Sequence, residues 1–177
     1  MLATAYIADP FFERERFERN ADLSVLEIAY KQNLLCGARV ESFLELNGFP
    51  GPLLGIGIDY SHATMHVDYT TIINKNPYQQ KQFIQTHRTQ LSFNYVTWIR
   101  PHMLGYIGLQ PGCVFSKSAV DSENAQYSYR DSNFNTRFSG RISYGFQFYF
   151  MRLTAVNIEF GYGSGAFVRA GLSLWVL

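Results

Sequence analysis

The dominant pattern along the chain is an alternation of apolar and polar positions. A period of two places successive side chains on opposite faces of a β-strand, and from about Leu34 onward almost no segment has the i, i+3, i+4 spacing of a helix. The connections between these segments are alternately tight turns and polar loops. The pattern therefore predicts an all-β meander, with strands at residues 21–31, 34–46, 53–71, 82–99, 103–120, 134–151, 154–163 and 166–177.

The alternation also separates the side chains into two faces. One face is apolar and rich in aromatic rings, whereas the opposite face is rich in glycine with isolated polar residues. The apolar set comprises Ile56, Ile58, Ile142, Tyr144, Phe146, Phe148, Val156, Ile158, Phe160, Leu172 and Leu174.

The connections between the predicted strands differ in length. Asn47 to Pro52, Arg100 to His102 and Arg152 to Leu153 are compact turns that fall at one end. Asn74 to Lys81 and Asp121 to Asn133 are longer polar loops at the other end. This asymmetry is typical of outer-membrane barrels.

Two architectures could produce such alternation: a soluble barrel with an apolar interior, or a membrane barrel with an apolar exterior. Composition favours the second, because aromatic residues make up 16% of the chain and charged residues only 16%, against about 25% in soluble domains. No apolar run approaches the length of about 20 residues that a membrane helix needs. Several strands exceed the 9 to 11 residues that cross a bilayer, so we expect them to continue beyond it on the long-loop side, with His62, Thr64 and His66 facing outward there.

A sheet in the hydrocarbon of a bilayer has to close on itself. In hydrocarbon each unpaired backbone group costs several kcal/mol, so the first and last strands must pair. Eight strands leave an interior that side chains can fill, and the glycine-rich face has the small residues that such a narrow interior needs. We expect a neutral, hydrogen-bonded plug, not an open pore, in which four arginines balance four carboxylates: Arg39, Arg137, Arg141 and Arg169 with Glu41, Glu45, Asp59 and Glu159.

The first 20 residues differ from the rest and are predicted to be an N-terminal extension, with the barrel domain at residues 21–177. Asp9 and Pro10 can start a helix, and the stretch FFERERFERN carries charge pairs at i, i+4, so a short helix near the short turns and an extended lead-in are both open. The chain begins without the basic and apolar regions of a signal peptide. If the protein is exported, we expect this numbering to start after cleavage.

Several stretches resemble a known family. GRISYGFQFYF and the later LTAVNIEFGYGSGAFVRAGLSLWVL resemble the closing strands of the small outer-membrane β-barrel proteins common in Bacteroidota, which are OmpA/OmpX-like eight-stranded barrels. RPHMLGYIGLQPGCVFS and PLLGIGIDYS look like earlier strands of the same family. The resemblance covers residues 34–177 and implies the fold and an outer-membrane location. The chain departs from the family at its end. Such barrels usually end in an aromatic residue on the lipid-facing side, whereas here the last residue is Leu177 and Trp175 falls on the interior face.

Candidate chemistry is sparse. His62 and His66 share a strand face but lie too far apart for ordinary joint metal ligation, and Cys36 and Cys113 lack any metal-ligand spacing, so we expect no metal and no cofactor. Ser61 and His62 are adjacent on a strand and should point to opposite faces. The loop GYGSG at residues 161–165 lacks the elements of a phosphate-binding loop and is expected to be a hairpin turn. A formal net charge of +1 gives no reason to expect nucleic-acid binding.

The sequence therefore predicts an integral protein of the bacterial outer membrane without a catalytic centre. Its expected contacts are outer-membrane lipid and lipopolysaccharide, and protein partners in an outer-membrane complex such as a secretion or motility machine. Two alternatives stay open at this point: a lipid-modifying enzyme with Ser61, His66 and Asp68 at the barrel rim, and a soluble ligand-binding barrel of the lipocalin type.

Overall fold

Antiparallel backbone pairing organises almost the whole molecule. The computed structural model describes residues 1–8, 25–32, 35–46, 53–73, 76–165 and 167–176. Its elements, in chain order, are β1 (Leu2–Ala8), β2 (Val25–Gln32), β3 (Leu35–Glu45), β4 (Leu53–Ile73), β5 (Asn76–Arg100), β6 (Met103–Ser122), the 3-10 helix η1 (Ala125–Tyr127), β7 (Tyr129–Arg130), β8 (Asn135–Met151), β9 (Thr154–Gly163) and β10 (Val168–Trp175). Within the described part of the chain, no helix is long and apolar enough to cross a bilayer.

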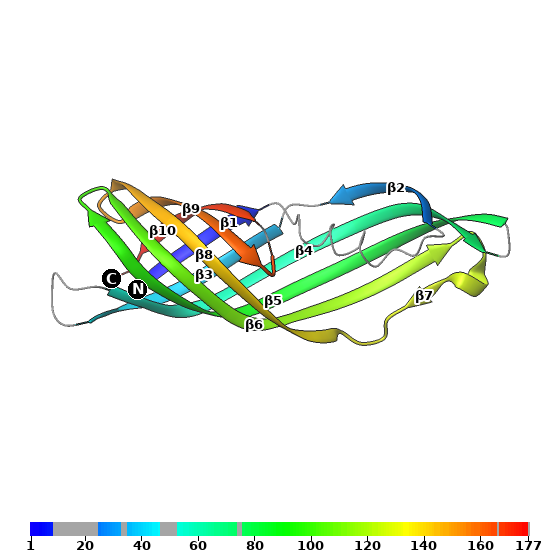
Figure 1. Ribbon diagram of the computed structural model, residues 1–177, viewed down its shortest axis with the longest axis horizontal. Coiled ribbons are helices and arrows are strands. Elements are labelled where there is room, and N and C mark those ends of the chain that lie inside the picture. Colours follow the sequence, from blue (N-terminus) through cyan, green and yellow to red (C-terminus); the bar gives the residue numbers. More distant parts are fainter. Residues whose placement is uncertain (9–24, 33–34, 47–52, 74–75, 166, 177) are drawn as a thin grey trace.

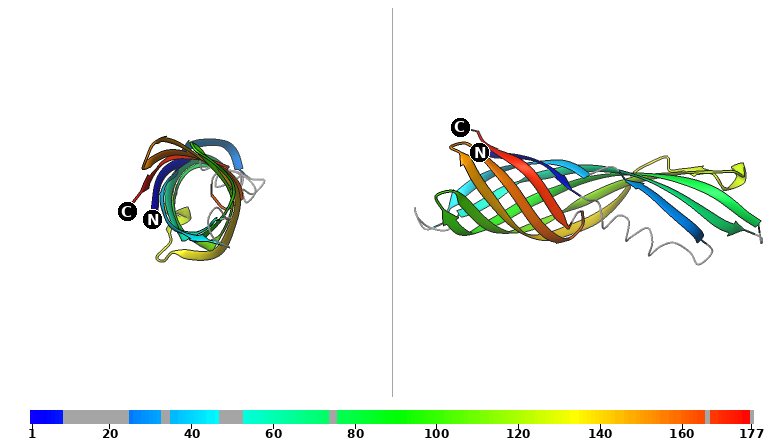
Figure 2. Two further views of the ribbon diagram at one scale, coloured as in Figure 1. Left: turned by 90° about the vertical axis from the view of Figure 1, so that its left-hand side faces the viewer. Right: turned by 90° about the horizontal axis from the view of Figure 1, so that it is seen from above.

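Eight of these strands form a closed ring. Around the ring the order is β4, β3, β1, β10, β9, β8, β6 and β5, and β5 pairs with β4 to complete it. The view along the barrel in Figure 2 shows this closure directly. Both chain ends lie at the end of the barrel that holds the short turns (Figure 1), as an even number of up-and-down strands requires. The predicted eight-stranded antiparallel barrel is therefore confirmed.

Seven of the eight predicted strand ranges coincide with ring strands to within a few residues, β3, β4, β5, β6, β8, β9 and β10. The largest difference is in β5, which begins at Asn76, so part of the predicted polar loop is strand. The register of β10 runs without a slip to the pair Leu2 and Trp175, and the indole of Trp175 faces inward, where its Nε1 donates to Tyr149 Oη at 3.2 Å.

The first ring strand requires a correction. It is β1, which pairs with β10 on one side and β3 on the other, so residues 2–8 belong to the barrel and not to an extension before it. The alternation does not mark β1, because its inward positions include Leu2 and Tyr6 and so differ little in polarity from its outward Ile7. The predicted strand at 21–31 corresponds to β2, whose one partner among the described strands is β4. The predicted helix after Asp9 lies outside the described residues.

Three ring strands continue well beyond the others. β4, β5 and β6 are 21, 25 and 20 residues long, whereas β1 and β10 have only 7 and 8. In Figure 1 the long strands project away from the short-turn end as an open sheet, with β2 along β4 and β7 along β6. We call this part of β4, β5 and β6, with β2 and β7, the extension; it confirms the prediction that strands continue on the long-loop side.

Closure by β1 leads to the first testable expectation. Ala5 lies in the middle of β1, opposite Leu172 of β10 and Ala38 of β3. Ala5→Pro removes a backbone donor and introduces a ring that a strand bonded on both sides cannot accommodate. The variant should therefore lose the fast-migrating folded band on unheated gels, whereas Ala5→Val, which suits an outward strand position, should keep it. A folded band for Ala5→Pro at wild-type intensity would contradict the assignment of β1 to the ring.

Candidate functional site

The ring directs alternate side chains into a narrow interior and onto an outer wall. All eleven residues predicted to form the apolar face point outward: nine are exposed, and Phe146 and Ile158 are half-buried among their neighbours. Ile142 and Leu172, for example, expose 62% and 58% of their surface. The apolar set therefore does not form a central core, and its contact with lipid stays a prediction.

The interior is polar and densely connected. Six of the eight charged residues predicted to lie inside are almost fully buried there: Arg39, Glu41, Asp59, Arg141, Glu159 and Arg169. They come from β3, β4, β8, β9 and β10, and the ring brings their side chains together. Burial of charge is costly unless each group is paired and hydrogen-bonded, so the contacts decide whether this interior is stable.

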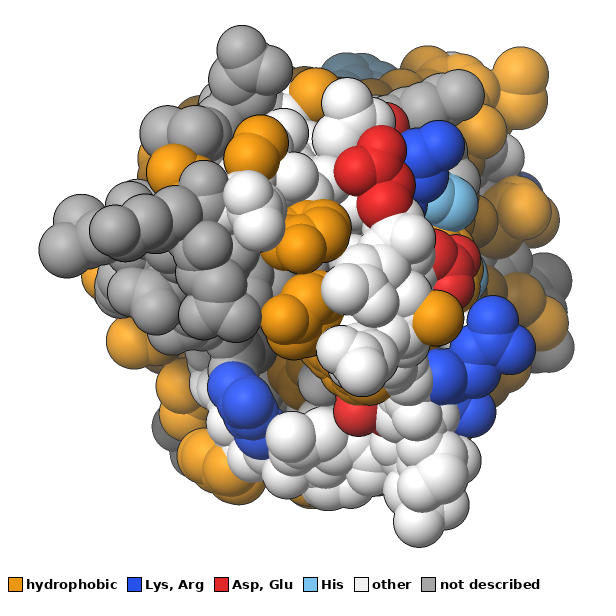
Figure 3. Space-filling view, turned by 90° about the vertical axis from the view of Figure 1, so that its right-hand side faces the viewer, with side chains coloured by type: hydrophobic (Ala, Val, Ile, Leu, Met, Phe, Trp, Pro, Cys, Tyr) orange, Lys and Arg blue, Asp and Glu red, His pale blue; other side chains and the backbone are white. Residues whose placement is uncertain are grey.

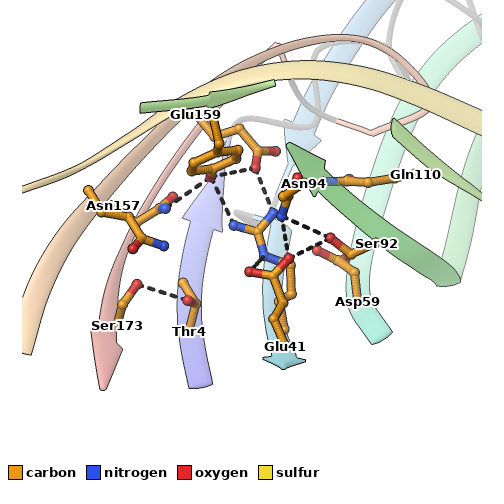
Figure 4. A network of polar contacts seen from close by, with 12 residues as sticks. Thr4, Glu41, Asp59, Ser92, Asn94, Gln110, Asn157, Glu159 and Ser173 are labelled. Atoms are coloured by element: carbon orange, nitrogen blue, oxygen red, sulfur yellow. Dashed lines mark hydrogen bonds and ion pairs between the residues drawn. The ribbon is translucent and has the colours of Figure 1, made fainter. Parts of the chain in front are cut away.

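Glu159 is the centre of these contacts. Its Oε2 lies 2.7 Å from Arg39 Nη1 and accepts a hydrogen bond from Tyr106 Oη at 2.9 Å. Its Oε1 lies 3.2 Å from Arg141 Nε and 3.6 Å from Arg169 Nη1. In Figure 4, Glu159 and Glu41 approach the same region from opposite sides. A single carboxylate thus serves three guanidinium groups from three other strands.

Glu41 and Asp59 complete the acidic set. Glu41 lies 3.4 Å from Arg39 Nε and accepts hydrogen bonds from Ser92 Oγ at 2.7 Å and from the side-chain amide of Asn94. Asp59 accepts from Tyr6 Oη at 2.6 Å and from Arg169 Nη1 at 3.0 Å. Each carboxylate therefore has a charged partner and at least one neutral donor, which is the condition for holding a carboxylate in a dry interior.

Inward glycines make room for the two buried tyrosines. A Cβ at Gly37 would lie 2.3 Å from Tyr6 Cζ, and a Cβ at Gly145 would lie 2.3 Å from Tyr106 Cζ. Any larger residue would collide with the rings that donate to Asp59 and Glu159. The expectation that small residues relieve crowding on the interior face is confirmed.

Two predicted members of the network lie elsewhere. Glu45 and Arg137 share the inward alternation of their strands but are exposed. Glu45 is the last residue of β3, at the short-turn rim. Arg137 lies on β8 beyond Arg141, where the pairing of β8 with β9 ends, so no ring encloses it.

The sequence prediction missed several interior residues. Arg88 on β5 is fully buried, and so are neutral residues that bond within the interior, such as Gln90, Gln110 and Asn157. The alternation of β5 that includes Ser92 and Asn94 could have indicated Arg88. Tyr6 and Tyr106 could not be assigned, because a tyrosine suits either face. Among the described residues four arginines and three carboxylates are buried, and the neutrality of the whole interior stays a prediction.

Ser61 lies apart from the histidines of β4 and β5. Ser61 is buried on the interior face and His62 faces outward, which confirms that adjacent strand residues diverge; Ser61 is therefore on the opposite side of the wall from His66 and Asp68. His62 pairs with His87 across the strands, with ring centroids 4.5 Å apart, and His87 Nδ1 lies 2.7 Å from Tyr60 Oη. Partial burial and the neighbouring His62 lower the pKa of His87. No group of three or more potential metal ligands occurs among the described residues.

Comparisons with known proteins give little beyond this geometry. No protein-family model matches the chain, and no curated protein matches it significantly. Among solved structures, the chain is similar to Ail, the attachment invasion locus protein of Yersinia pestis, with 13% identity over 98% of this chain and 93% of that chain and a TM-score of 0.41. A structure of Ail in complex with the heparin analogue sucrose octasulfate gives 10% identity, coverage of 98% and 94%, and a TM-score of 0.40. The assignment of the barrel rests on the strand pairing itself.

The central position of Glu159 can be tested by removing its charge. Glu159→Gln leaves Arg39 and Arg141 buried with less compensation, and breaking a buried pair in this way typically costs about 3 to 5 kcal/mol. We expect a loss of that order in the free energy of unfolding, measured with urea in detergent micelles. The matched control is Glu45→Gln at the exposed rim, which should change stability by no more than about 0.5 kcal/mol. Equal effects of the two substitutions would contradict the network.

Proposed function

We propose that the chain is an integral β-barrel of the bacterial outer membrane with a structural or interaction role, and that it acts as an anchor that presents its extension to partners outside the bilayer. The observation that carries this proposal is the combination of an apolar, exposed outer wall with a charged, buried interior. In water such a wall would place a broad apolar surface in contact with solvent, which soluble monomers avoid. Against acyl chains the same wall is favourable.

The chemistry of the outer wall changes along the long strands. On β4 the outward residues Ile56, Ile58 and Tyr60 are apolar or aromatic, and the next outward residues are His62 and Thr64. On β5, which runs in the opposite direction, the outward residues just before Leu91 are likewise polar: Thr89, His87 and Gln85. An apolar band that ends near tyrosines is what a bilayer interface favours, because tyrosine combines an apolar ring with a polar tip.

The extension supports the interaction role. Its end, which faces the viewer in Figure 3, combines uncharged polar surface with acidic and basic side chains and some apolar ones. Lys81 and Asp68, for example, are exposed and lie opposite each other on β5 and β4. A mixed polar sheet outside the apolar band is suited to contact with lipopolysaccharide headgroups or with proteins. A role as accessory subunit of a secretion or motility complex, and an origin in Bacteroidota, are part of this proposal and are supported only by the sequence motifs.

The other two functions fit the geometry less well. A lipocalin-type barrel needs an apolar interior that can receive a ligand, whereas this interior is filled with paired charges. A rim enzyme would need Ser61 beside His66 and Asp68, but Ser61 faces the interior and the other two face outward. We therefore propose a non-catalytic role and expect no modification of lipid by the purified protein.

Membrane insertion can be tested with one substitution on each part of β4. Ile58→Arg places a charge on the apolar band and should destabilise the protein in lipid bilayers by about 2 to 4 kcal/mol. Thr70→Arg, on the same strand face within the extension, should cost about 1 kcal/mol or less. Folding into bilayers under a urea titration measures both. Equal and small costs, or a protein that stays folded and monodisperse without detergent, would contradict the membrane proposal.

The anchoring role can be tested by shortening the extension. His66 and Phe83 are register partners, so deleting residues 67–82 and joining these positions by a short turn should leave the ring intact. We expect the shortened protein to keep its folded band on unheated gels but to lose the proteins that co-purify with the full chain after gentle detergent extraction. Unchanged co-purification, or a full chain that purifies as a lone monomer, would count against a partner at the extension.

A further inference from the structure

Two histidines from neighbouring strands lie side by side on the outer wall. His62 of β4 and His87 of β5 are register partners, and their ring centroids are 4.5 Å apart. Residues opposite each other on paired strands have Cβ atoms roughly 4.5 to 5.5 Å apart, much closer than His62 and His66 along one strand. The sequence predicts no metal here because it does not reveal which residue lies opposite His62. The register supplies that missing information.

The distance between the two rings suits a shared metal ion. A metal bonds an imidazole nitrogen at about 2.1 Å, so two rings bound to one ion at a right angle have centres roughly 4.5 Å apart. The observed separation of the His62 and His87 rings equals this value. Rotation of the two side chains therefore suffices to direct one nitrogen of each ring toward a common point, and the backbone does not have to move.

The contacts of His87 hold its ring in the form that binds a metal. Its Nδ1 lies 2.7 Å from Tyr60 Oη, and its Nε2 lies 3.1 Å from the side-chain amide nitrogen of Gln85. Because an amide nitrogen only donates, Nε2 is the nitrogen with the free lone pair, and Nδ1 donates its hydrogen to Tyr60. A metal-binding histidine typically donates its other ring nitrogen in this way, which fixes the ring. The lowered pKa of His87 also favours the neutral ring that ligation needs.

His62 has a nitrogen to offer as the second ligand. Its Nδ1 is buried and has no hydrogen-bond partner among the described residues. Buried polar atoms are rarely left unsatisfied, and a metal ion is one of the partners that an imidazole nitrogen accepts. Both rings are half-buried as a whole, so an ion can reach the pair from outside.

The pair lies where the closed ring gives way to the extension. The pairing of β4 with β3 ends at His62, and the apolar outward residues Ile58 and Tyr60 come just before it. Phe134 contacts His87 edge-on, with ring centroids 5.5 Å apart. An ion held by both histidines would therefore join β4 to β5 at the base of the extension.

We propose that His62 and His87 together bind one divalent transition-metal ion of the Zn²⁺ type on the outer wall, with water completing its coordination. Ions of this kind prefer imidazole ligands, whereas Mg²⁺ and Ca²⁺ prefer oxygen. Two protein ligands leave positions around the ion that water fills. The site depends on the strand register and not on the membrane location, so it can fail or hold independently of the proposed function.

The test uses the full chain folded in detergent micelles and titrated with zinc chloride in a calorimeter at neutral pH. We expect one ion per chain. His62→Asn and His87→Asn should each weaken binding about tenfold or more, because a single imidazole no longer chelates the ion. The chain has two other histidines as matched controls, so His66→Asn and His102→Asn should keep the affinity of the unaltered protein. Absence of Zn²⁺ binding, or equal losses in all four variants, would overturn the proposal.

Two further measurements distinguish this site from other zinc ligands. Cys36 of β3 is the register partner of His62, and thiolates also bind Zn²⁺, so Cys36→Ser should leave the affinity unchanged. Loss of binding in Cys36→Ser would refute a site made by two histidines. If a histidine variant does not fold, crystals of the unaltered protein soaked in zinc chloride decide. An anomalous peak between the rings of His62 and His87 supports the site, whereas zinc bound only at other residues, or no peak, refutes it.

Discussion

Hydrogen bonding of every ring strand on both sides is the constraint on which the rest of this structure depends. Once β1 pairs with both β3 and β10, the ring has no edge, and the alternation of each strand sets which side chains are enclosed. The narrow interior then admits few arrangements. Charged groups that would be solvated on an open sheet are forced together, and their stability depends on the partners that the neighbouring strands supply.

The interior solves this packing problem twice with the same combination of residues. Tyr6 lies over Gly37, donates to Asp59 and has the guanidinium of Arg169 near its ring. In the second instance, Tyr106 lies over Gly145, donates to Glu159 and has Arg39 5.5 Å from its ring centre. A glycine makes space for the ring, the ring fills volume, and its hydroxyl satisfies a carboxylate that also pairs with arginine. Each combination thus fills space and neutralises charge at once.

The sequence predicts the strands well because alternation is a strong signal wherever the two faces differ in polarity. β8 and β9 show this contrast, and their bounds agree with the prediction to within one residue. Glu159 and Arg169 are buried, as the same alternation predicts. β1 lacks the contrast, so it could not be recognised. Alternation gives the face of a residue but not how far the ring extends along the strand. For this reason it predicts Glu45 to lie inside the barrel, whereas Glu45 is exposed at the rim.

The extent of the ring and the extent of the apolar band can be compared, because one is a property of the backbone and the other of the side chains. On β4 the pairing with β3 ends at His62, and the consecutive apolar outward positions Ile56, Ile58 and Tyr60 end just before it. Below this level all strands of the ring are paired, which is what hydrocarbon would demand of a barrel in a bilayer. Above it the sheet is open, which water permits because water can bond to the free backbone groups of an edge. On β4, strand pairing and the change in side-chain chemistry therefore fall at nearly the same level, as the proposed membrane location would require.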